Sequence, residues 1–564
     1  MGSSAPAFDR WLDGFLAWYY RTHPVDATFI GVHEYDYWFL PDCSAQGLDD
    51  LDIDMQLLRE ELSRLPDEAL SEAQTHDRRL ADGFLEIKLW EIDSKHVQRG
   101  NPSYYTGEAI FSIMALFHRD SEPVEERAKS AIARMRAIPG FLARGRANIQ
   151  SAPALWTERA IRESRSGIAY FERGIAILAR ERGIESESFA SASEAAAEAF
   201  RIHLNWLESE LAISTNDDYA AGREALDRYL VKGHMLKPEQ DSRWVESYAR
   251  RALETAQQEL EDRARQLDPT RNWREQLGDL ASLHPTVDDY YERYSDVWKE
   301  ARSAAIEADL VTWPDFPIDF IPIPESDREA ASGLYYLFYR CPAPFGKPET
   351  HQYRVTPIDE AMPVDEQERL LRSTNDSVIK LNHVVHHGGL GHHVQNWNAF
   401  RARSRIGKIA GVDGSSRLAF FCAGTLVEGW ACYATDLAEE IGFLTPLESL
   451  SEQQSRVRMA ARALADVGIH TGSMTLSEAA AFYEREAGMS PSAATGEAVK
   501  NSMFPGAALI YLIGTQAIHD LRDEMQRREG DAFSLKRFHD RFLTFGAIPV
   551  SLIAESMLAN STTA

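Results

Sequence analysis

Five of the chain's 17 histidines lie within positions 383–393. They are His383, His386, His387, His392 and His393. Imidazole is a common zinc ligand and also a proton carrier near neutral pH. Packing alone rarely explains such a density of imidazoles in an otherwise acidic chain, so the cluster predicts a metal site or a proton-transfer site.

The spacing of these histidines limits which of them share one ion. Two ligating nitrogens at about 2.0–2.1 Å from zinc require neighbouring Cβ atoms. His386 and His393 would be about 10.5 Å apart along a regular helix, which is too far. His383 and His387 are four positions apart and suit one helix face. His386 and His392 are six apart and would point to different faces of a regular helix.

Three glycines separate His386 from His392 and change that expectation. They are Gly388, Gly389 and Gly391. Glycine tolerates backbone conformations that permit a bulge or a break in a helix. Two residues looped out would turn the six-residue spacing into an effective four. The glycines therefore predict a distorted metal-binding helix.

Several other segments carry ordered motifs. They are 24–28 (Pro-Val-Asp-Ala-Thr) with Gly31, 428–434 (Glu-Gly-Trp-Ala-Cys-Tyr-Ala), 466–470 (Asp-Val-Gly-Ile-His), 504–506 (Phe-Pro-Gly) with Tyr511 and Gly514, and 546–549 (Gly-Ala-Ile-Pro). Together with the histidine string, this set resembles the family catalogued as domain of unknown function 885, whose signature is His-Glu-Ala-x-Pro-Gly-His-His. That family in turn resembles helical zinc peptidases of the thermostable (Taq) carboxypeptidase type. The resemblance covers nearly the whole chain.

The resemblance implies a set of metal ligands. His386 and His392 would bind one zinc ion, and Glu428 would supply the third ligand from a following helix. Three protein ligands leave room for water, as catalytic zinc requires. His393 is an alternative second ligand, and a helix-surface charge is the alternative for Glu428.

The resemblance also implies other site residues. His470 and Tyr511 would face the cleft and stabilise an oxyanion by hydrogen bonding, with a capped helix end and a core tyrosine as the structural alternatives. Arg354, on a β-prone segment, would pair with a peptide carboxylate unless it is an ordinary exposed arginine.

The histidine string departs from the signature at the general base. Zinc peptidases carry a glutamate after the first histidine, and this chain has His387 there. No acidic residue occurs from Ser377 to Arg405. Positioned acid–base catalysis contributes roughly 10²–10⁴-fold, so the loss is substantial. Either His387 replaces the base, a carboxylate arrives from elsewhere, or the chain is a catalytically weak relative.

Helical periodicity dominates the elements that must position these residues. Phe200, Leu204, Leu207 and Leu211 recur at helical spacing, and similar apolar stripes run through 80–97, 133–148, 169–179 and 244–267. The uncharged stretch 505–519 is too short to span a bilayer and predicts a buried helix. Aromatic-rich 334–339 and β-prone 352–356 predict a small antiparallel sheet beside the active-site cleft. We expect a mainly α, metallopeptidase-like fold, one domain in two lobes, 1–300 and 301–564.

Composition narrows the function classes. The 564 residues include 60 basic and 87 acidic side chains, a formal net charge of −27. That field repels phosphate backbones and anionic lipid, so neither nucleic acid nor a membrane is an expected partner. The four cysteines lack metal-site spacing and predict buried thiols, and the N-terminus lacks the pattern of a secretory signal. A cytoplasmic location is the resulting expectation.

The sequence thus supports two functions. The first is a zinc-dependent peptidase of carboxypeptidase-like architecture, acting on short peptides in a helical cleft. The second is a catalytically inactive metal- or peptide-binding relative that keeps the same fold. The intact ligand set favours the first, and the absent glutamate favours the second.

Overall fold

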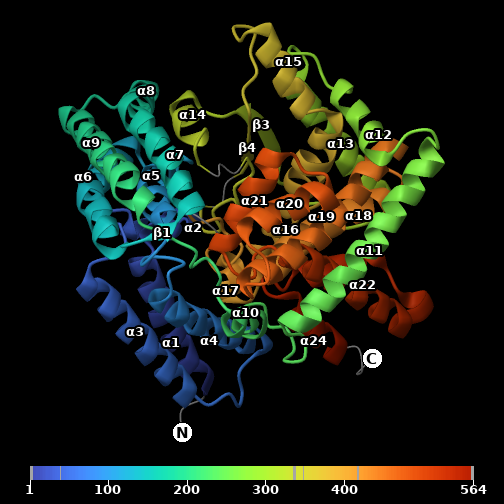
Figure 1. Ribbon diagram of the computed structural model, residues 1–564. Coiled ribbons are helices and arrows are strands. Elements are labelled where there is room, and N and C mark those ends of the chain that lie inside the picture. Colours follow the sequence, from blue (N-terminus) through green and yellow to red (C-terminus); the bar gives the residue numbers. More distant parts are fainter. Residues whose placement is uncertain (1–3, 38–39, 335–337, 347–348, 416–417, 561–564) are drawn as a thin grey trace. The chain divides into compact units, whose positions relative to one another are not determined.

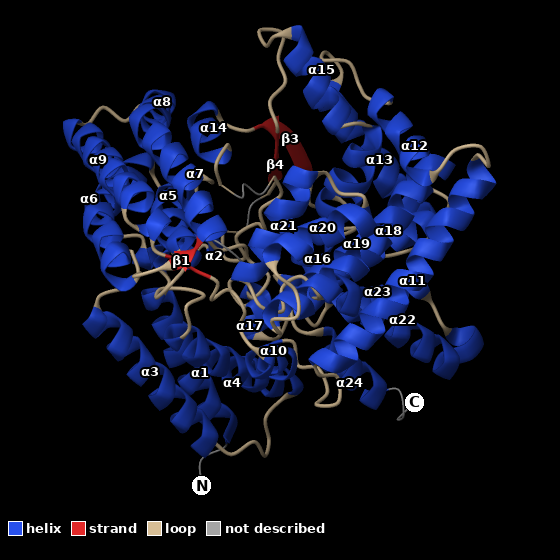
Figure 2. Ribbon diagram, viewed as in Figure 1, coloured by secondary structure: helices blue, strands red, loops and turns tan. Residues whose placement is uncertain are grey.

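The computed structural model describes residues 4–37, 40–334, 338–346, 349–415 and 418–560. Helices dominate these residues, and two short two-stranded sheets account for their named strands (Figures 1 and 2). The prediction of a mainly helical protein is confirmed. Among the described helices, none combines the length and apolar character needed to cross a membrane.

The chain divides into two compact units. Unit 1 comprises Met1–Ala221, Ile323–Pro348 and Val412–Phe420, and unit 2 comprises Gly222–Pro322, Glu349–Gly411 and Phe421–Ala564. This division differs from the predicted boundary near residue 300. Residues 222–322 belong to unit 2 because α11 (Ser242–Leu267) packs on α19 (Pro446–His470) and α13 (Tyr290–Glu307) packs on η6 (Val378–Gly388).

Unit 1 is built of helices packed by their apolar faces. Its longer elements are α1 (Ser4–Thr22), α2 (Pro24–Ile30), α3 (Ala45–Arg64), α4 (Glu72–Asp93), α5 (Pro102–Phe117), α6 (Val124–Asn148), α7 (Ala154–Ala169), α8 (Ile175–Arg182), α9 (Glu187–Ser209) and α14 (Glu325–Ala331). The short elements are η1 (His33–Tyr35), η2 (Tyr170–Gly174), η3 (Leu211–Ile213), β1 (Ala152–Pro153) and β2 (Thr215–Asn216). The predicted stripe is confirmed, since Phe200 and Leu207 of α9 are fully buried. Helix α9 packs on α6 and α7, and α5 lies against the same two helices.

Unit 2 holds the histidine cluster. Besides α11, α13, α19 and η6, its helices are α10 (Arg223–Arg228), α12 (Trp273–Gly278), α15 (Val364–Ser373), α16 (His392–Ala399), α17 (Arg405–Ile409), α18 (Gly424–Glu440), α20 (Leu476–Ala487), α21 (Pro491–Met503), α22 (Ile510–Glu529), α23 (Leu535–Leu543) and α24 (Val550–Asn560). Shorter turns are η4 (Tyr229–Gly233), η5 (Asp279–Ser282), η7 (Phe421–Ala423) and η8 (Gly530–Ala532). The tightest element pairs are α11 with α19 and α18 with α22. The elements that carry the cluster, η6 and α16, pack on α18, and η6 also packs on α13.

The predicted antiparallel sheet is wrong in its pairing. Strand β4 (His351–Val355) lies within a residue of the predicted β-prone segment, but it pairs in parallel with β3 (Ile318–Pro322), placing Phe320 beside Tyr353. A parallel pair requires a long crossover, and the 28 residues between Pro322 and His351 include helix α14. Residues 335–337 of the other predicted strand lie outside the described residues, and Leu334, Phe338 and Tyr339 are not in strands.

The four cysteines, Cys43, Cys341, Cys422 and Cys432, are free and buried, as predicted. The predicted buried helix over 505–519 begins later than expected, because α22 starts at Ile510. The backbone N–H groups of Gly506, Ala508 and Leu509 instead donate to the carboxylate of Asp466, at 3.1, 2.8 and 3.0 Å. A side chain distant in sequence therefore delays the start of the helix.

Candidate metal centre

The histidine segment is an irregular helix followed by a tight turn. Element η6 is a π-helix, which has wider turns than an α-helix, and α16 begins at His392 after the glycines. A Cβ on Gly391 would overlap the carbonyl oxygen of His386, and one on Gly389 would lie 2.8 Å from that of Val384. The glycines therefore allow the turn to fold back onto the helix. This is the distortion that the sequence predicts.

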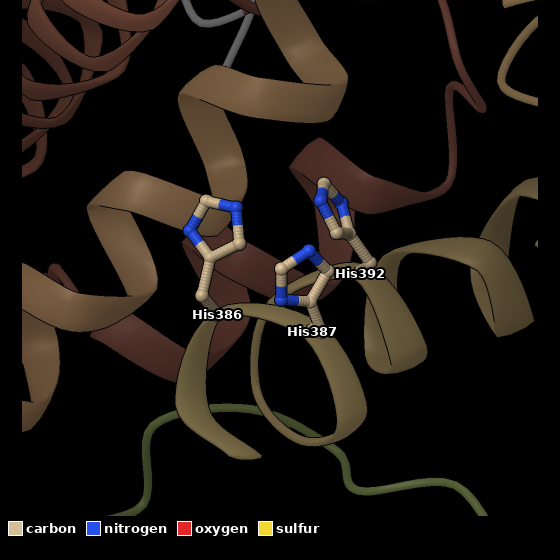
Figure 3. A group of neighbouring side chains, drawn as sticks. All are labelled: His386, His387 and His392. Carbon is tan, nitrogen blue, oxygen red and sulfur yellow. The ribbon is translucent and has the colours of Figure 1, made fainter. Parts of the chain in front are cut away.

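The distortion gathers three imidazoles. The ring centroids of His386 and His392 lie 4.9 Å apart, and the ring of His387 lies 4.7 Å from the first and 5.3 Å from the second. One nitrogen from each ring lies within 4.8 Å of the others. Figure 3 shows His386 and His387 on the end of η6 and His392 at the start of α16, with the three rings close together. Histidines six positions apart thus reach the same point.

Glu428 of α18 faces two of these rings. Its Oε2 lies 3.4 Å from His386 Nε2 and 3.8 Å from His392 Nε2. Ligand atoms at about 2.0–2.1 Å from a tetrahedral zinc ion lie about 3.4 Å apart. The two measured distances are close to that separation, and the donor set of two imidazoles and one carboxylate is one that catalytic zinc uses. The side chains present therefore fit a zinc ion.

Neighbouring helices hold the turn in place. Trp430 donates from Nε1 to the carbonyl of Leu390 at 2.9 Å and to that of Gly391 at 3.2 Å. Trp298 of α13 donates to the carbonyl of Gly388 at 2.8 Å. Since Trp430 lies two residues after Glu428, one helix positions both the carboxylate and the histidine turn.

Helix α18 is in turn fixed against α22 by glycines. A Cβ on Gly429 would lie 2.6 Å from the carbonyl carbon of Gly514, and one on Gly514 would overlap the carbonyl oxygen of Thr425. Only two glycines permit the helices to approach this closely. The contact brings the start of α22, with Tyr511, beside the segment that carries Glu428.

The electrostatics favour the ligand forms of these groups. Burial lowers the pKa of His392 to about 4, and burial with the neighbouring imidazoles lowers the pKa of His387 well below its usual value. Burial alone would raise the pKa of Glu428, but the hydrogen bond from His386 and the charge at His392 outweigh it and bring the pKa to about 2. At neutral pH His387 and His392 therefore offer imidazole lone pairs and Glu428 offers an ionised carboxylate, the forms that metal binding requires.

His387 has a defined tautomer. Its Nδ1 donates to the carbonyl of Asn382 at 2.6 Å, since a carbonyl only accepts. The neutral ring therefore carries its proton on Nδ1 and its lone pair on Nε2. That nitrogen can accept a proton or bind a metal.

The other two histidines of the string are engaged elsewhere. His393 is fully buried, donates from Nε2 to the carbonyl of Phe316 at 2.8 Å and stacks on the Phe316 ring. The alternative in which His393 is the second ligand therefore conflicts with its placement. His383 lies 2.6 Å from the hydroxyl of Tyr353 through Nδ1, and burial lowers its pKa to about 4. Both imidazoles position backbone or strand rather than joining the three gathered rings.

His470 has the surroundings of a structural residue rather than of an oxyanion donor. Its ring is fully buried, and Nε2 donates to the carbonyl of Asn501 at 3.0 Å, while Asp466 Oδ1 lies 3.5 Å away. Burial raises the pKa of Asp466 to about 7 although three N–H groups donate to it. The Asp-Val-Gly-Ile-His segment therefore organises the loop before α22. An oxyanion role for His470 is not supported by this geometry.

Tyr511 and Arg354 differ in their relation to the centre. The guanidinium of Arg462 lies over the Tyr511 ring, 4.7 Å from its centroid, and the charge of Arg462 acts on Glu428. Tyr511 therefore contacts an arginine whose charge acts on the carboxylate ligand. Arg354 lies on β4 opposite Ile321 and is 4% exposed, so the alternative of an ordinary exposed arginine is wrong.

Sequence reasoning missed the parts that hold the centre together. Trp298 lies 90 residues from the carbonyl it binds and belongs to no recognised motif. Trp430 is within a recognised motif, but a motif does not reveal that its indole binds the turn. Arg462 of α19, whose charge acts on Glu428, gave no signal either, because an arginine on a helix is ordinary.

Comparisons with known proteins agree with this architecture. A family model described as a bacterial protein of unknown function, DUF885, matches residues 24–557. A solved structure from Shewanella oneidensis, described as "a putative lipoprotein of unknown function", is 21% identical, with a TM-score of 0.78 over 99% of this chain and 100% of that one. A similarly described structure from Colwellia psychrerythraea is 15% identical, with a TM-score of 0.80 over the whole of both chains. No curated protein matches the chain. The chain therefore belongs to the DUF885 family of bacterial proteins of unknown function.

Proposed function

We propose that this protein is a zinc-dependent peptidase acting on short peptides, with His386, His392 and Glu428 as ligands of one zinc ion. The observation that carries the proposal is the placement of Glu428 Oε2 at 3.4 and 3.8 Å from the two Nε2 atoms. A zinc ion shared by the three residues would need their donor atoms to converge on one point, and these distances bring them together.

Bound zinc would polarise a peptide carbonyl and acidify a water molecule. The chain's own residues would supply the remaining chemistry. His387 stands where zinc peptidases carry the general base, and its proton on Nδ1 leaves Nε2 to accept another. Tyr511, whose ring contacts Arg462, remains the proposed donor to an oxyanion.

A second ligand set competes with the first. His386, His387 and His392 together meet the distance condition for three metal ligands. In that set His387 binds the ion instead of accepting a proton, and Glu428 lies outside. The set with Glu428 is favoured because its distances of 3.4 and 3.8 Å are close to the separation of two ligands on a tetrahedral zinc ion, whereas the nitrogens of the three histidines lie within the wider limit of 4.8 Å.

The second candidate function is a non-catalytic metal- or peptide-binding protein of the same fold. The observation that favours it is His387 itself. Its Nδ1 is tied to Asn382, so the imidazole has less freedom than a glutamate to follow a proton through the reaction. In its metal-binding form this function shares the metal site with the first and differs only in proton transfer.

The experiment that separates them restores a carboxylate with His387→Glu. If a missing base limits catalysis, the zinc-loaded variant should hydrolyse short peptides at least about tenfold faster than the wild type, because general-base catalysis contributes roughly 10²–10⁴-fold. A chelator should abolish the gain. The matched control is His387→Gln, because glutamine has the size of glutamate but cannot act as a general base.

Equal rates in the wild type and His387→Glu, with zinc measured in both, would favour the non-catalytic function. Loss of zinc from both His387→Gln and His387→Glu, but not from Glu428→Ala, would favour the three-histidine ligand set.

A further inference from the structure

A buried glutamine lies one helical turn after His392. Gln395 is 1% exposed and, like His392, belongs to α16. Side chains three positions apart lie on the same face of a helix, and helical side chains lean toward its N-terminus, so the amide of Gln395 extends toward the His392 ring. The backbone N–H of Gln395 donates to the carbonyl of Gly391 at 3.1 Å, which ties this turn to the end of the histidine segment.

The surroundings of the Gln395 amide are apolar. A Cβ on Gly411 would lie 3.6 Å from Gln395 Nε2, and it would lie 3.1 Å from the Cβ of Ala547 and 3.3 Å from a methyl group of Val427. Neither amide atom has a partner in ordinary hydrogen-bond geometry among the described residues. A buried amide in that situation costs stability. Hydrogen bonding within the fold therefore does not account for Gln395.

The influence of Gln395 falls on His392. Burial lowers the pKa of His392, and the charges of Glu428 and His386 and a hydrogen bond with the Gln395 side chain also act on it. That hydrogen bond is long or bent, because the amide atoms meet no partner in ordinary geometry within the described part of the chain. Hydrogen bonds at functional sites are often loose before a ligand binds, and they tighten in the complex.

The two nitrogens of the His392 ring face different groups. Nε2 lies 3.8 Å from Glu428 Oε2, on the side where the proposed zinc would bind. Nδ1 is therefore the nitrogen that the Gln395 side chain can reach. A histidine that binds a metal through one nitrogen almost always donates the N–H of the other nitrogen to an acceptor, which fixes its tautomer and orientation. The oxygen of an amide can be that acceptor.

We propose that Gln395 is a positioning residue whose Oε1 accepts a hydrogen bond from Nδ1–H of His392 and so keeps the lone pair of Nε2 directed at the metal. This inference rests on the proposed function for the metal, and it gives Gln395 a role at that site without contact with the ion. The opposite orientation of the amide, with its nitrogen donating to Nδ1, would place the ring proton on Nε2 and block metal binding. The amide thus selects the tautomer of His392.

Gln395→Met tests the role, because methionine is unbranched like glutamine and has no amide. Zinc affinity, measured by competition with a chelating dye, should fall about 10- to 100-fold, the usual loss when the partner of a ligating histidine is removed. The zinc-free variant should resist denaturant as well as the wild type or better, since an apolar group replaces a poorly bonded buried amide. A purely structural residue would lose stability instead. Gln395→Glu keeps an oxygen acceptor and should restore most of the zinc affinity.

Gln276 of α12 supplies the matched control. It is also 1% exposed, and its Nε2 donates to the carbonyls of Ala264, Asp268 and Arg271 at 2.9, 3.1 and 2.8 Å. Gln276→Met should therefore lower the denaturant midpoint and leave zinc affinity unchanged. The two substitutions remove the same amide, and we expect them to change stability and zinc affinity in opposite patterns.

Nitrogen NMR of the zinc-free protein separates this inference from the metal proposal. With isotope-labelled histidine, the signals of His392, assigned by their absence in His392→Gln, report which ring nitrogen carries the proton. The wild type should show the Nδ1–H tautomer, and Gln395→Met should shift the balance toward the Nε2–H tautomer. That result supports the role of Gln395 even if the wild type fails to bind zinc.

Three results would overturn the inference. They are an Nε2–H tautomer in the wild type, the same tautomer balance in Gln395→Met, and equal zinc affinity in the two proteins.

Discussion

The two units bury polar groups in different ways. In unit 1, Arg134 is fully buried and donates to Thr28 Oγ1 at 2.8 Å and to the carbonyls of Ser112 and Asp36 at 2.8 and 3.1 Å. In unit 2, two imidazoles meet one oxygen of Glu428 at 3.4 and 3.8 Å. The first arrangement distributes contacts around a charge, whereas the second directs several lone pairs toward one point. Arg134 therefore has the surroundings of a structural residue, whereas Glu428 and its two imidazoles have the arrangement of a candidate metal site.

Gly140 and Gly391 illustrate two roles of glycine in the chain. In α6 of unit 1, Gly140 has open space where a Cβ would lie, so a larger residue could replace it without a steric clash. In unit 2, Gly391 lies against the carbonyl oxygen of His386. A backbone that must pass this close to itself has no place for another side chain.

The largest expected effect comes from placing a side chain at Gly391, with Gly140 as the comparison. Gly391→Ala should destabilise unit 2 by about 3 kcal/mol, because the turn must move to relieve a backbone overlap, and it should reduce zinc affinity as well. Gly140→Ala should stabilise the protein by about 0.5–1 kcal/mol through helix propensity. Denaturant unfolding and zinc titration measure both. A Gly391→Ala variant as stable as the wild type would show that the turn tolerates a side chain.

The next prediction compares two tryptophans. Trp430→Phe keeps an aromatic ring but removes the donor to the carbonyls of Leu390 and Gly391, so zinc affinity should fall about tenfold. Trp11→Phe in unit 1 removes a donor to the carbonyl of Leu58 and should cost about 1 kcal/mol of stability, with zinc affinity unchanged. Equal effects of the two substitutions on zinc affinity would mean that Trp430 does not position the turn.

The sequence predicts the features that depend on periodicity or spacing among neighbouring residues. The apolar stripe with Phe200 and Leu207 indicates a packed helix because burial repeats every three or four residues. The glycines between His386 and His392 predict a distortion, and the structure contains one. Both inferences need only neighbouring residues.

The sequence does not reveal features that depend on distant residues. The partner of β4 is β3, and nothing in the local pattern of 352–356 identifies a parallel neighbour some thirty residues earlier. The late start of α22 depends on Asp466, and the place of the histidine turn depends on Trp298. His393 shows the same limit, since the carbonyl of Phe316 decides its orientation.

A third prediction concerns two buried histidines and acid. Burial lowers the pKa of His203 in unit 1 to about 3 and that of His393 in unit 2 to about 4. As pH falls below about 6.5, the unfolded chain takes up protons before the folded chain does, so each histidine reduces stability progressively down to its folded pKa. His203→Leu and His393→Leu should both lessen the loss of stability between pH 6.5 and 4.

The two variants should differ at neutral pH. Neither ring nitrogen of His203 has a hydrogen-bond partner among the described residues, so His203→Leu should stabilise by about 1 kcal/mol. His393→Leu removes the donor to the carbonyl of Phe316 and should destabilise by about 1–3 kcal/mol. Unfolding free energies at pH 7 and pH 5 test both signs. The same sign for both variants at pH 7 would contradict the difference in hydrogen bonding.

The zinc content of the reconstituted protein tests the central claim most directly. Elemental analysis after zinc loading and desalting should give one ion per chain for the wild type and well below one for Glu428→Ala. Glu440→Ala is the matched control, because Glu440 ends the same helix and pairs with Arg522 at 2.9 Å. It should keep the ion. A wild type that stays free of metal, or a Glu428→Ala variant that binds zinc as tightly as Glu440→Ala, would contradict the assignment of His386, His392 and Glu428 as the metal centre.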